Sequence, residues 1–252
     1  MVSQRCCVRA TMGALLVVHT GLLVWGGLRH SPSVDEVGHF AAGVTHWQTG
    51  RYELYRVNPP LVRMVATFPV AFRVPEVDRS LLVRYPGYRG EFRAGTWLFD
   101  SMGPTVLWHV TVARWACIPF SLVGGYFCYR WASELYGAAS GLTALGLWCF
   151  SPNILANAQM MTTDVGAAAL GLVAWYAFWK WIRHPSWRAA CLAGIALGLA
   201  ELTKTTWIIL YGLLPAFWVA SAFRGLCARS AHVGRPGAAQ LALILLLSLA
   251  MI

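Results

Sequence analysis

ATMGALLVVHTGLLVWGGL, residues 10–28, is an apolar run that contains no Asp, Glu, Lys or Arg. Its length matches the roughly 20 residues that a helix needs to cross the hydrocarbon core of a bilayer. Arg5 and Arg9 precede the run, as in a signal peptide, but no persuasive small-residue cleavage site follows it. The sequence therefore predicts that this segment is retained as a membrane anchor.

The rest of the chain is similarly apolar. Of the 252 residues, 58% are hydrophobic and 12% are charged, whereas about a quarter of the residues in a soluble domain are charged. Further apolar runs occupy residues 106–129, 138–152, 164–182, 189–203, 206–223 and 239–252. We therefore predict an all-α integral membrane protein with about six to seven transmembrane helices.

The basic residues predict how these helices are oriented. If the N-terminus is cytoplasmic, every short cytoplasmic connection is basic, as the positive-inside rule requires. These connections contain Arg130, Lys180, Arg183, Arg188, Arg224, Arg229 and Arg235. The other side receives residues 30–105, a large first exoplasmic loop with eight arginines and seven acids. Topology thus accounts for the net charge of +10, and the scattered basic residues argue against a nucleic-acid partner.

The loop begins with a helix signal. Ser33 is a predicted N-cap, and Glu36 three residues later completes a capping box, which gives Glu36 a structural role. In a helix over residues 34–48, Asp35 and His39 share one face. Asp35 is not part of this capping box. Asp35 is either a residue with a catalytic role or a solvated first-turn acid that interacts favourably with the helix dipole.

An Asn-Pro-Pro turn at residues 58–60 then blocks helix formation. After this turn, residues 61–72 form a second predicted amphipathic juxtamembrane segment, which carries Arg63. Because the loop holds seven acids, ion pairs are expected for most of its arginines. For Arg51, Arg56 and Arg63, contact with a phosphate or a sugar acid is the alternative.

Three acids lie outside the loop, and two of them are expected near the exoplasmic membrane boundary. Asp164 opens one apolar run, and Glu201 with Lys204 closes another. Ionisable groups at this depth are costly unless they are paired or face water, which makes them functional candidates. The structural alternatives are an Asp164 N-cap and a Glu201–Lys204 pair that marks a helix end.

Several motifs in order give the chain a resemblance to a known family. They are Asp35-Glu36 after the first helix, NPPL at 58–61, VARW at 112–115, FSPNILANAQMMTTDVGAAAL at 150–170 and GIALGLAELTKTT at 194–206. Together they resemble the N-terminal part of the GT-C membrane glycosyltransferases that use polyprenyl- or dolichyl-phosphate sugars. The resemblance is to protein O-mannosyltransferase-like enzymes and to the transferases that add aminoarabinose to lipid A.

The resemblance implies transfer of a sugar from a polyprenyl-phosphate-linked donor to an acceptor hydroxyl at the exoplasmic face, with inversion. It implies that Asp35 is the general base, that Asp164 is the second acid, and that Lys204 and Arg114 hold the donor phosphate. Glu36, His39 and Arg63 are the further candidates for substrate binding. This chemistry needs a carboxylate to take the acceptor proton and cations to stabilise the departing phosphate.

A divalent cation is left open, because Asp and His side chains suit several such ions. Its candidate ligands are Asp35, His39 and Asp164. A transporter or flippase with an intramembrane ion path, and an inactive fragment or lipid-binding subunit, are the alternatives to a transferase. The sequence indicates neither the donor sugar nor the acceptor. A multi-pass protein of the bacterial inner membrane, in contact with membrane lipids, is expected rather than one of the endoplasmic reticulum.

The organisation expected from the resemblance is one transmembrane glycosyltransferase domain over residues 1–252, truncated relative to the family. The last apolar run, residues 239–252, is shorter than the roughly 20 residues that span a bilayer. We therefore expect a complementing C-terminal segment, and little transferase activity from these residues alone.

Overall fold

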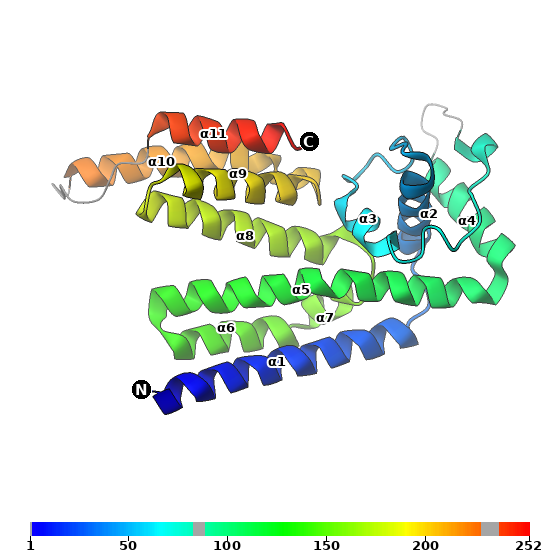
Figure 1. Ribbon diagram of the computed structural model, residues 1–252, viewed down its shortest axis with the longest axis horizontal. Coiled ribbons are helices and arrows are strands. Elements are labelled where there is room, and N and C mark those ends of the chain that lie inside the picture. The colour runs from blue at the N-terminus through cyan, green and yellow to red at the C-terminus, as the bar shows by residue number, and fades with distance from the viewer. Residues whose placement is uncertain (1, 83–88, 228–236) are drawn as a thin grey trace. The chain divides into compact units, whose positions relative to one another are not determined.

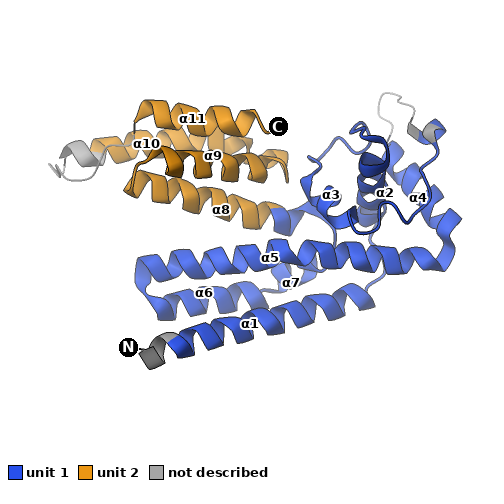
Figure 2. Ribbon diagram, in the orientation of Figure 1, with its two compact units in different colours: residues 1–166 blue, residues 167–252 orange. Residues whose placement is uncertain are grey.

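The computed structural model describes residues 2–82, 89–227 and 237–252, which form helices and turns and contain no strand. This confirms the all-α prediction. The predicted cytoplasmic connection with Arg229 and Arg235 lies outside the described residues. Figure 1 shows the helices in chain order, and Figure 2 shows that they form two compact units, Met1–Gly166 and Ala167–Ile252.

The apolar part of the first unit consists of three helices that lie side by side (Figure 1): α1 (Val2–Arg29), α5 (Val106–Tyr136) and α6 (Ala138–Phe150). His19 of α1 joins them, because its Nδ1 lies 2.9 Å from the Cys149 carbonyl oxygen and its Nε2 lies 2.9 Å from Ser121 Oγ. Since a carbonyl can only accept, Nδ1 carries the proton. This histidine thus satisfies polar groups of two neighbouring helices.

The polar part of the first unit is built from α2 (Val34–Thr49), α3 (Leu61–Thr67) and α4 (Gly90–Met102). Gly43 lets α3 approach α2 closely, because a Cβ at this position would lie 2.6 Å from the carbonyl oxygen of Arg63. Trp47 Nε1 donates to the Met64 carbonyl at 2.8 Å across the same contact. Phe40, Val62, Leu98 and Val110 share the core beneath these helices.

The second unit contains most of α8 (Thr163–Arg183), α9 (Trp187–Glu201), the 3₁₀ turn η3 (Thr205–Ile209), α10 (Leu210–Cys227) and α11 (Ala238–Leu249). α9 packs closely on α11, because Gly194 and Gly198 present no side chain to Ile244 and Met251. Trp181 Nε1 donates to Gln240 Oε1 at 3.0 Å and ties α8 to α11.

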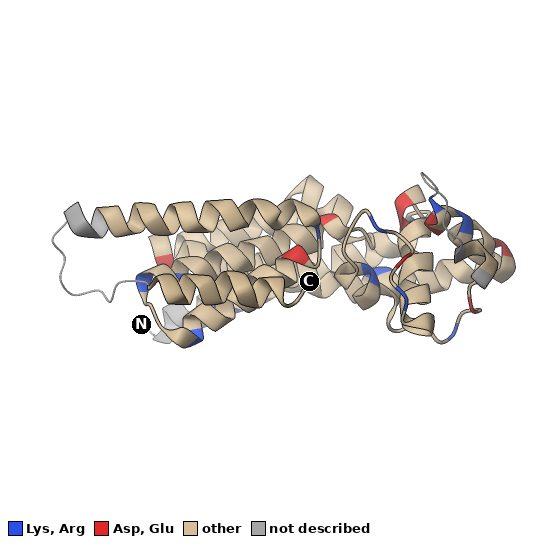
Figure 3. Cartoon of the chain, turned by 90° about the horizontal axis from the view of Figure 1, so that it is seen from above, with Lys and Arg blue, Asp and Glu red and all other residues tan. Residues whose placement is uncertain are grey.

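Four described helical segments are long and apolar enough to cross a membrane: Cys6–Arg29, Gly90–Tyr136, Thr163–Arg183 and Thr205–Phe223. Ala138–Phe150 and Ala238–Leu249 are shorter apolar helices. Figure 3 shows the long stretches of helix without a charged residue. These features are those of a multi-pass membrane protein.

The helices depart from the sequence predictions in three places. α4 and α7 (Pro152–Ala158) were not predicted, although Ser151 followed by Pro152 at the first helical position is a helix-start signal. The predicted segment 61–72 is helical only to Thr67 and continues as turns.

Candidate functional site

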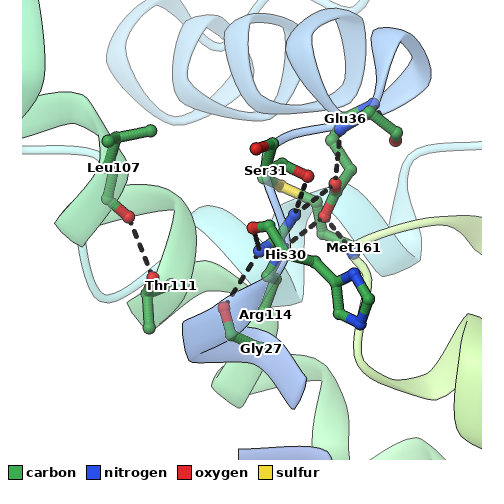
Figure 4. Close-up of polar contacts among 9 residues, drawn as sticks. Gly27, His30, Ser31, Glu36, Leu107, Thr111, Arg114 and Met161 are labelled. Atoms are coloured by element: carbon green, nitrogen blue, oxygen red, sulfur yellow. Dashed lines mark hydrogen bonds and ion pairs between the residues drawn. The ribbon is translucent and has the colours of Figure 1, made fainter. Parts of the chain in front are cut away.

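The centre of the first unit is a buried ion pair between Arg114 of α5 and Glu36 of α2 (Figure 4). Arg114 Nε and Nη2 each donate to one carboxylate oxygen of Glu36 at 2.7 Å. The remaining N–H groups of Arg114 donate to the carbonyl oxygens of Gly27, His30 and Ser31 at 2.7–3.1 Å. All five guanidinium donors are therefore used. These carbonyls lie at and just beyond the end of α1, where helical partners are lacking.

The carboxylate of Glu36 likewise accepts several hydrogen bonds. Besides Arg114, its carboxylate accepts from the Ser33 backbone N–H at 2.9 Å, which confirms the predicted capping box, and from the Met161 N–H at 3.2 Å. Burial acts to raise the pKa of Glu36, but the hydrogen bonds from Arg114, Ser33 and Met161 and the charge of Arg114 outweigh it and lower that pKa. The carboxylate is therefore ionised, and no part of it is exposed.

This geometry changes how two of the expected substrate-binding residues are interpreted. The resemblance implies that Arg114 holds the donor phosphate, but in this structure it has no donor left for a ligand. Glu36 is likewise occupied by four hydrogen bonds. Their ion pair joins the end of α1, the start of α2, α5 and the segment before α8.

A second buried arginine, Arg63 of α3, has different surroundings. Its Nε donates to His46 Nε2 at 2.9 Å, and its Nη2 donates to the carbonyl oxygens of Tyr55 and Asn58 at 2.8 and 2.7 Å. Its Nη1 is buried and has no hydrogen-bond partner among the described residues. Burial lowers the pKa of Arg63 to about 10, so the group is still positive at neutral pH. Each of its hydrogen-bond partners is neutral.

Two histidines of α2 flank this arginine. His46 Nδ1 donates to the Arg51 carbonyl at 2.8 Å, which fixes the tautomer whose Nε2 accepts from Arg63. His39 is also buried, and its Nδ1 has no partner among the residues that the structure describes. Burial and then the positive charge of Arg63 lower the pKa of each histidine to about 4. Both are therefore neutral at pH 7.

The candidate acids lie around this cluster in different ways. Asp35 is exposed in the first turn of α2, one residue before the buried Glu36. Asp164 is exposed in the first turn of α8, and its negative charge opposes the lowering of the His39 pKa. Lys204 lies in the second unit, at the N-cap of η3. The first unit thus brings Asp35, His39, Arg63 and Asp164 to one region.

The expected loop ion pairs form for some arginines and not for Arg63. Arg51 pairs with Glu53 at 3.2 Å, and Arg89 pairs with Glu91. No three His, Cys, Asp or Glu side chains within residues 2–82, 89–227 and 237–252 come together as metal ligands. The candidates for a divalent cation, Asp35, His39 and Asp164, therefore do not form a ligand cluster.

Two residues of this region were missed by sequence reasoning. Tyr55 contacts Arg63 through both its carbonyl oxygen and its ring, whose centroid lies 5.0 Å from the guanidinium carbon. Met161 contributes its backbone N–H to Glu36. A signal for Tyr55 exists only in its position three residues before the Asn-Pro-Pro turn, and a backbone donor such as Met161 leaves no sequence signal.

Comparison with known protein families gives a match over more than half of the chain. The family model described as dolichyl-phosphate-mannose-protein mannosyltransferase matches residues 105–251. The matched region contains Arg114, Asp164 and Lys204, whereas Asp35 and Arg63 precede it. No curated protein and no solved structure matches the chain.

Proposed function

The chain belongs to the dolichyl-phosphate-mannose-protein mannosyltransferase family, and we propose that it transfers a sugar from a polyprenyl-phosphate-linked donor to an acceptor hydroxyl at the exoplasmic membrane face. Family membership favours a glycosyltransferase over a transporter. The acceptor is a hydroxyl of a protein, a lipid or a glycan.

The observation that carries the proposal is the state of Arg63. This cation is 2% exposed, its partners are neutral, and its Nη1 has two N–H groups without an acceptor. A buried charge in such a state is costly unless an anion joins it. The phosphate group of a lipid-linked sugar is an anion whose oxygens suit a guanidinium. We therefore assign Arg63 to the donor phosphate, with the unpartnered Nδ1 of His39 as a second polar contact.

Asp35 is the proposed general base. As the acceptor oxygen attacks the anomeric carbon, Asp35 takes the hydroxyl proton, and the bond from that carbon to the phosphate oxygen breaks. Polyprenyl phosphate leaves with the bonding electrons, and its added negative charge is stabilised by cations. Direct displacement inverts the configuration of the sugar. The exposure of Asp35 suits this role, since the acceptor has to reach the carboxylate.

Lys204 and Asp164 complete the proposal through their motifs. Lys204 is assigned to phosphate binding by its motif, because its ammonium group is a compact positive charge. Asp164 is assigned as the second acid, acting near His39. Arg114 and Glu36 are assigned to positioning, because they fix the start of α2, on which Asp35 lies.

The test compares Asp35→Asn with the wild type in liposomes. Release of polyprenyl phosphate from a panel of polyprenyl-phosphate sugars is measured, with membrane extract supplying acceptors. Asp35→Asn keeps the shape and removes the base, so turnover should fall by at least ~100-fold while donor binding is largely kept. Lys204→Ala should instead weaken donor binding.

The matched control is Asp100→Asn, the same change at an exposed residue in the last turn of α4. It should leave turnover unchanged. Near-normal transfer by Asp35→Asn would remove Asp35 from its proposed role, and unchanged donor affinity in Lys204→Ala would remove the lysine.

A further inference from the structure

Tyr55 has an unusual backbone conformation. Its φ is 60°, and within the described ranges it is the only residue other than glycine with a positive φ. A bulky side chain rarely adopts this left-handed conformation, and it persists only where the surroundings hold it. Tyr55 is 5% exposed, so packing does hold it. Strained positions of this kind cluster at functional sites.

The strained conformation coincides with a direct contact to the proposed phosphate-binding arginine. The Tyr55 carbonyl oxygen accepts from Arg63 Nη2 at 2.8 Å, and the ring centroid lies 5.0 Å from the guanidinium carbon. Tyr55 therefore contacts Arg63 both through its backbone and through its ring. The ring contact is a cation–π interaction, which restrains the guanidinium without consuming an N–H donor.

The ring of Tyr55 is itself fixed on other sides. His39 stacks on it with ring centroids 4.3 Å apart and an angle of 29°, and the guanidinium carbon of Arg89 lies 5.6 Å from its centroid. Gly38 of α2 makes room for the ring, because a Cβ there would lie 3.2 Å from Tyr55 Cε2. One of the residues that hold Tyr55, His39, thus belongs to the proposed site.

Tyr55 also lies close to the proposed base. Burial and then the negative charge of Asp35 raise the pKa of the Tyr55 phenol, and the positive charges of Arg89 and Arg63 oppose that change. The hydroxyl is therefore protonated at neutral pH. The Tyr55 side chain is thus in contact with Arg63 and within the range of the charge of Asp35.

We propose that Tyr55 is a positioning residue that holds Arg63 in a fixed orientation and so sets the affinity of the site for the donor phosphate. The inference rests on the proposed function. Its ring and its carbonyl oxygen restrain the guanidinium without using Nη1, whose two N–H groups have no acceptor among the described residues.

The test uses Tyr55→Gly and Tyr55→Phe in the full chain. Glycine adopts a φ of 60° without strain, so the fold should be retained, but the ring beside Arg63 is lost. We expect the Kd for polyprenyl phosphate, and the KM for the donor, to rise about tenfold with kcat changed less than about twofold. Tyr55→Phe keeps the ring and should bind within about twofold of the wild type.

The control is Tyr136→Gly, because Tyr136 is exposed at the last position of α5. It should leave the Kd unchanged. If Tyr55→Gly does not fold, Tyr55→Asn replaces it, since asparagine also tolerates the left-handed region. A folded Gly or Asn variant with the wild-type Kd overturns the inference.

A further variant separates this inference from the proposed function. Arg63→Lys should weaken binding of polyprenyl phosphate if the site is the proposed one. If the wild type does not bind polyprenyl phosphate, or if Arg63→Lys binds it as tightly as the wild type, the proposed function of the site fails. If Arg63→Lys binds weakly and Tyr55→Gly binds normally, only the role of Tyr55 fails.

Discussion

Arg114 and Arg63 are each 2% exposed, yet their guanidinium groups have opposite surroundings. Arg114 pairs with a carboxylate, and its five N–H groups all have acceptors. Arg63 contacts a neutral imidazole and two carbonyl oxygens, and its Nη1 has no partner in the described part of the chain. Burial alone therefore does not distinguish an arginine with all its hydrogen bonds made from one with N–H groups left unpartnered. The charge of the partners and the number of free donors do.

The two arrangements have different energetic consequences. In the Arg114–Glu36 pair, each charge offsets the desolvation of the other, so removing one partner leaves an isolated buried charge. Arg63 is a buried charge whose hydrogen-bond partners are all neutral, and the acid that acts on it, Glu91, does so without a hydrogen bond. Its removal costs hydrogen bonds but also removes the desolvation penalty. The comparison therefore predicts that the same substitution has unequal effects at the two positions.

The largest expected effect is on the stability of the fold. Arg114→Met leaves the Glu36 carboxylate buried without its partner and should lower the free energy of unfolding by about 3–5 kcal/mol. Arg63→Met should lower it by about 1 kcal/mol or less, because three lost hydrogen bonds are partly offset by the removal of a buried charge. Unfolding in detergent gives both values. Equal losses for the two variants would contradict the distinction.

The second effect is a difference in the pH at which the two regions lose their contributions to the free energy of unfolding. His39 and His46 have pKa values of about 4, below the ordinary value of 6.5, so the unfolded chain binds more protons between these limits. The stability that the neutral histidines contribute is present above pH 6.5 and is lost as the pH falls toward 4. Between pH 6.5 and 5.5 the loss should be about 1 kcal/mol for each histidine.

The contribution of Glu36 to stability should be lost at lower pH than that of the histidines. Its pKa is lowered, so its contribution is present above the ordinary value of 4.5 and is lost as the pH falls below that value. His46→Gln should therefore reduce the loss of unfolding free energy between pH 6.5 and 5.5 by about 1 kcal/mol, whereas the contribution of Glu36 is lost below pH 4.5. The measurement is the free energy of unfolding against pH. A wild-type protein whose stability is constant from pH 7 to 5 would contradict the buried neutral histidines.

Local sequence patterns predicted those features that depend only on residues close together in the sequence. The apolar runs became helices, and the Ser33–Glu36 capping box formed as expected, since both residues lie in one helical turn. The ion pair between Glu36 and Arg114 joins residues 78 positions apart, so no local pattern reveals it. Each residue could be recognised separately, but their pairing depends on how α2 packs near α5.

The same limit applies to the candidate site. The loop composition favoured ion pairs for its arginines, and Arg51 and Arg89 form them. Which arginine lacks an acid depends on the packing of α3 against α2, which Gly43 permits. The positive φ of Tyr55 also has no sequence signal, because the conformation is imposed on a residue that does not favour it.

The smallest expected effect is the stabilisation of the folded protein by a bound phosphate ligand. A compound that binds only the folded protein raises the free energy of unfolding by about 1.4 kcal/mol when its concentration is ten times its Kd. A short-chain polyprenyl phosphate should give this stabilisation in the wild type. Arg63→Met should lose most of it at the same concentration, whereas Arg73→Met, the same change at an exposed arginine, should keep it. Because Arg63→Met is expected to fold, the lost stabilisation would report the missing phosphate contact rather than a damaged protein. Equal stabilisation of both variants would place the phosphate away from Arg63, and Arg63 would then be a buried charge for which the protein has no known counter-ion.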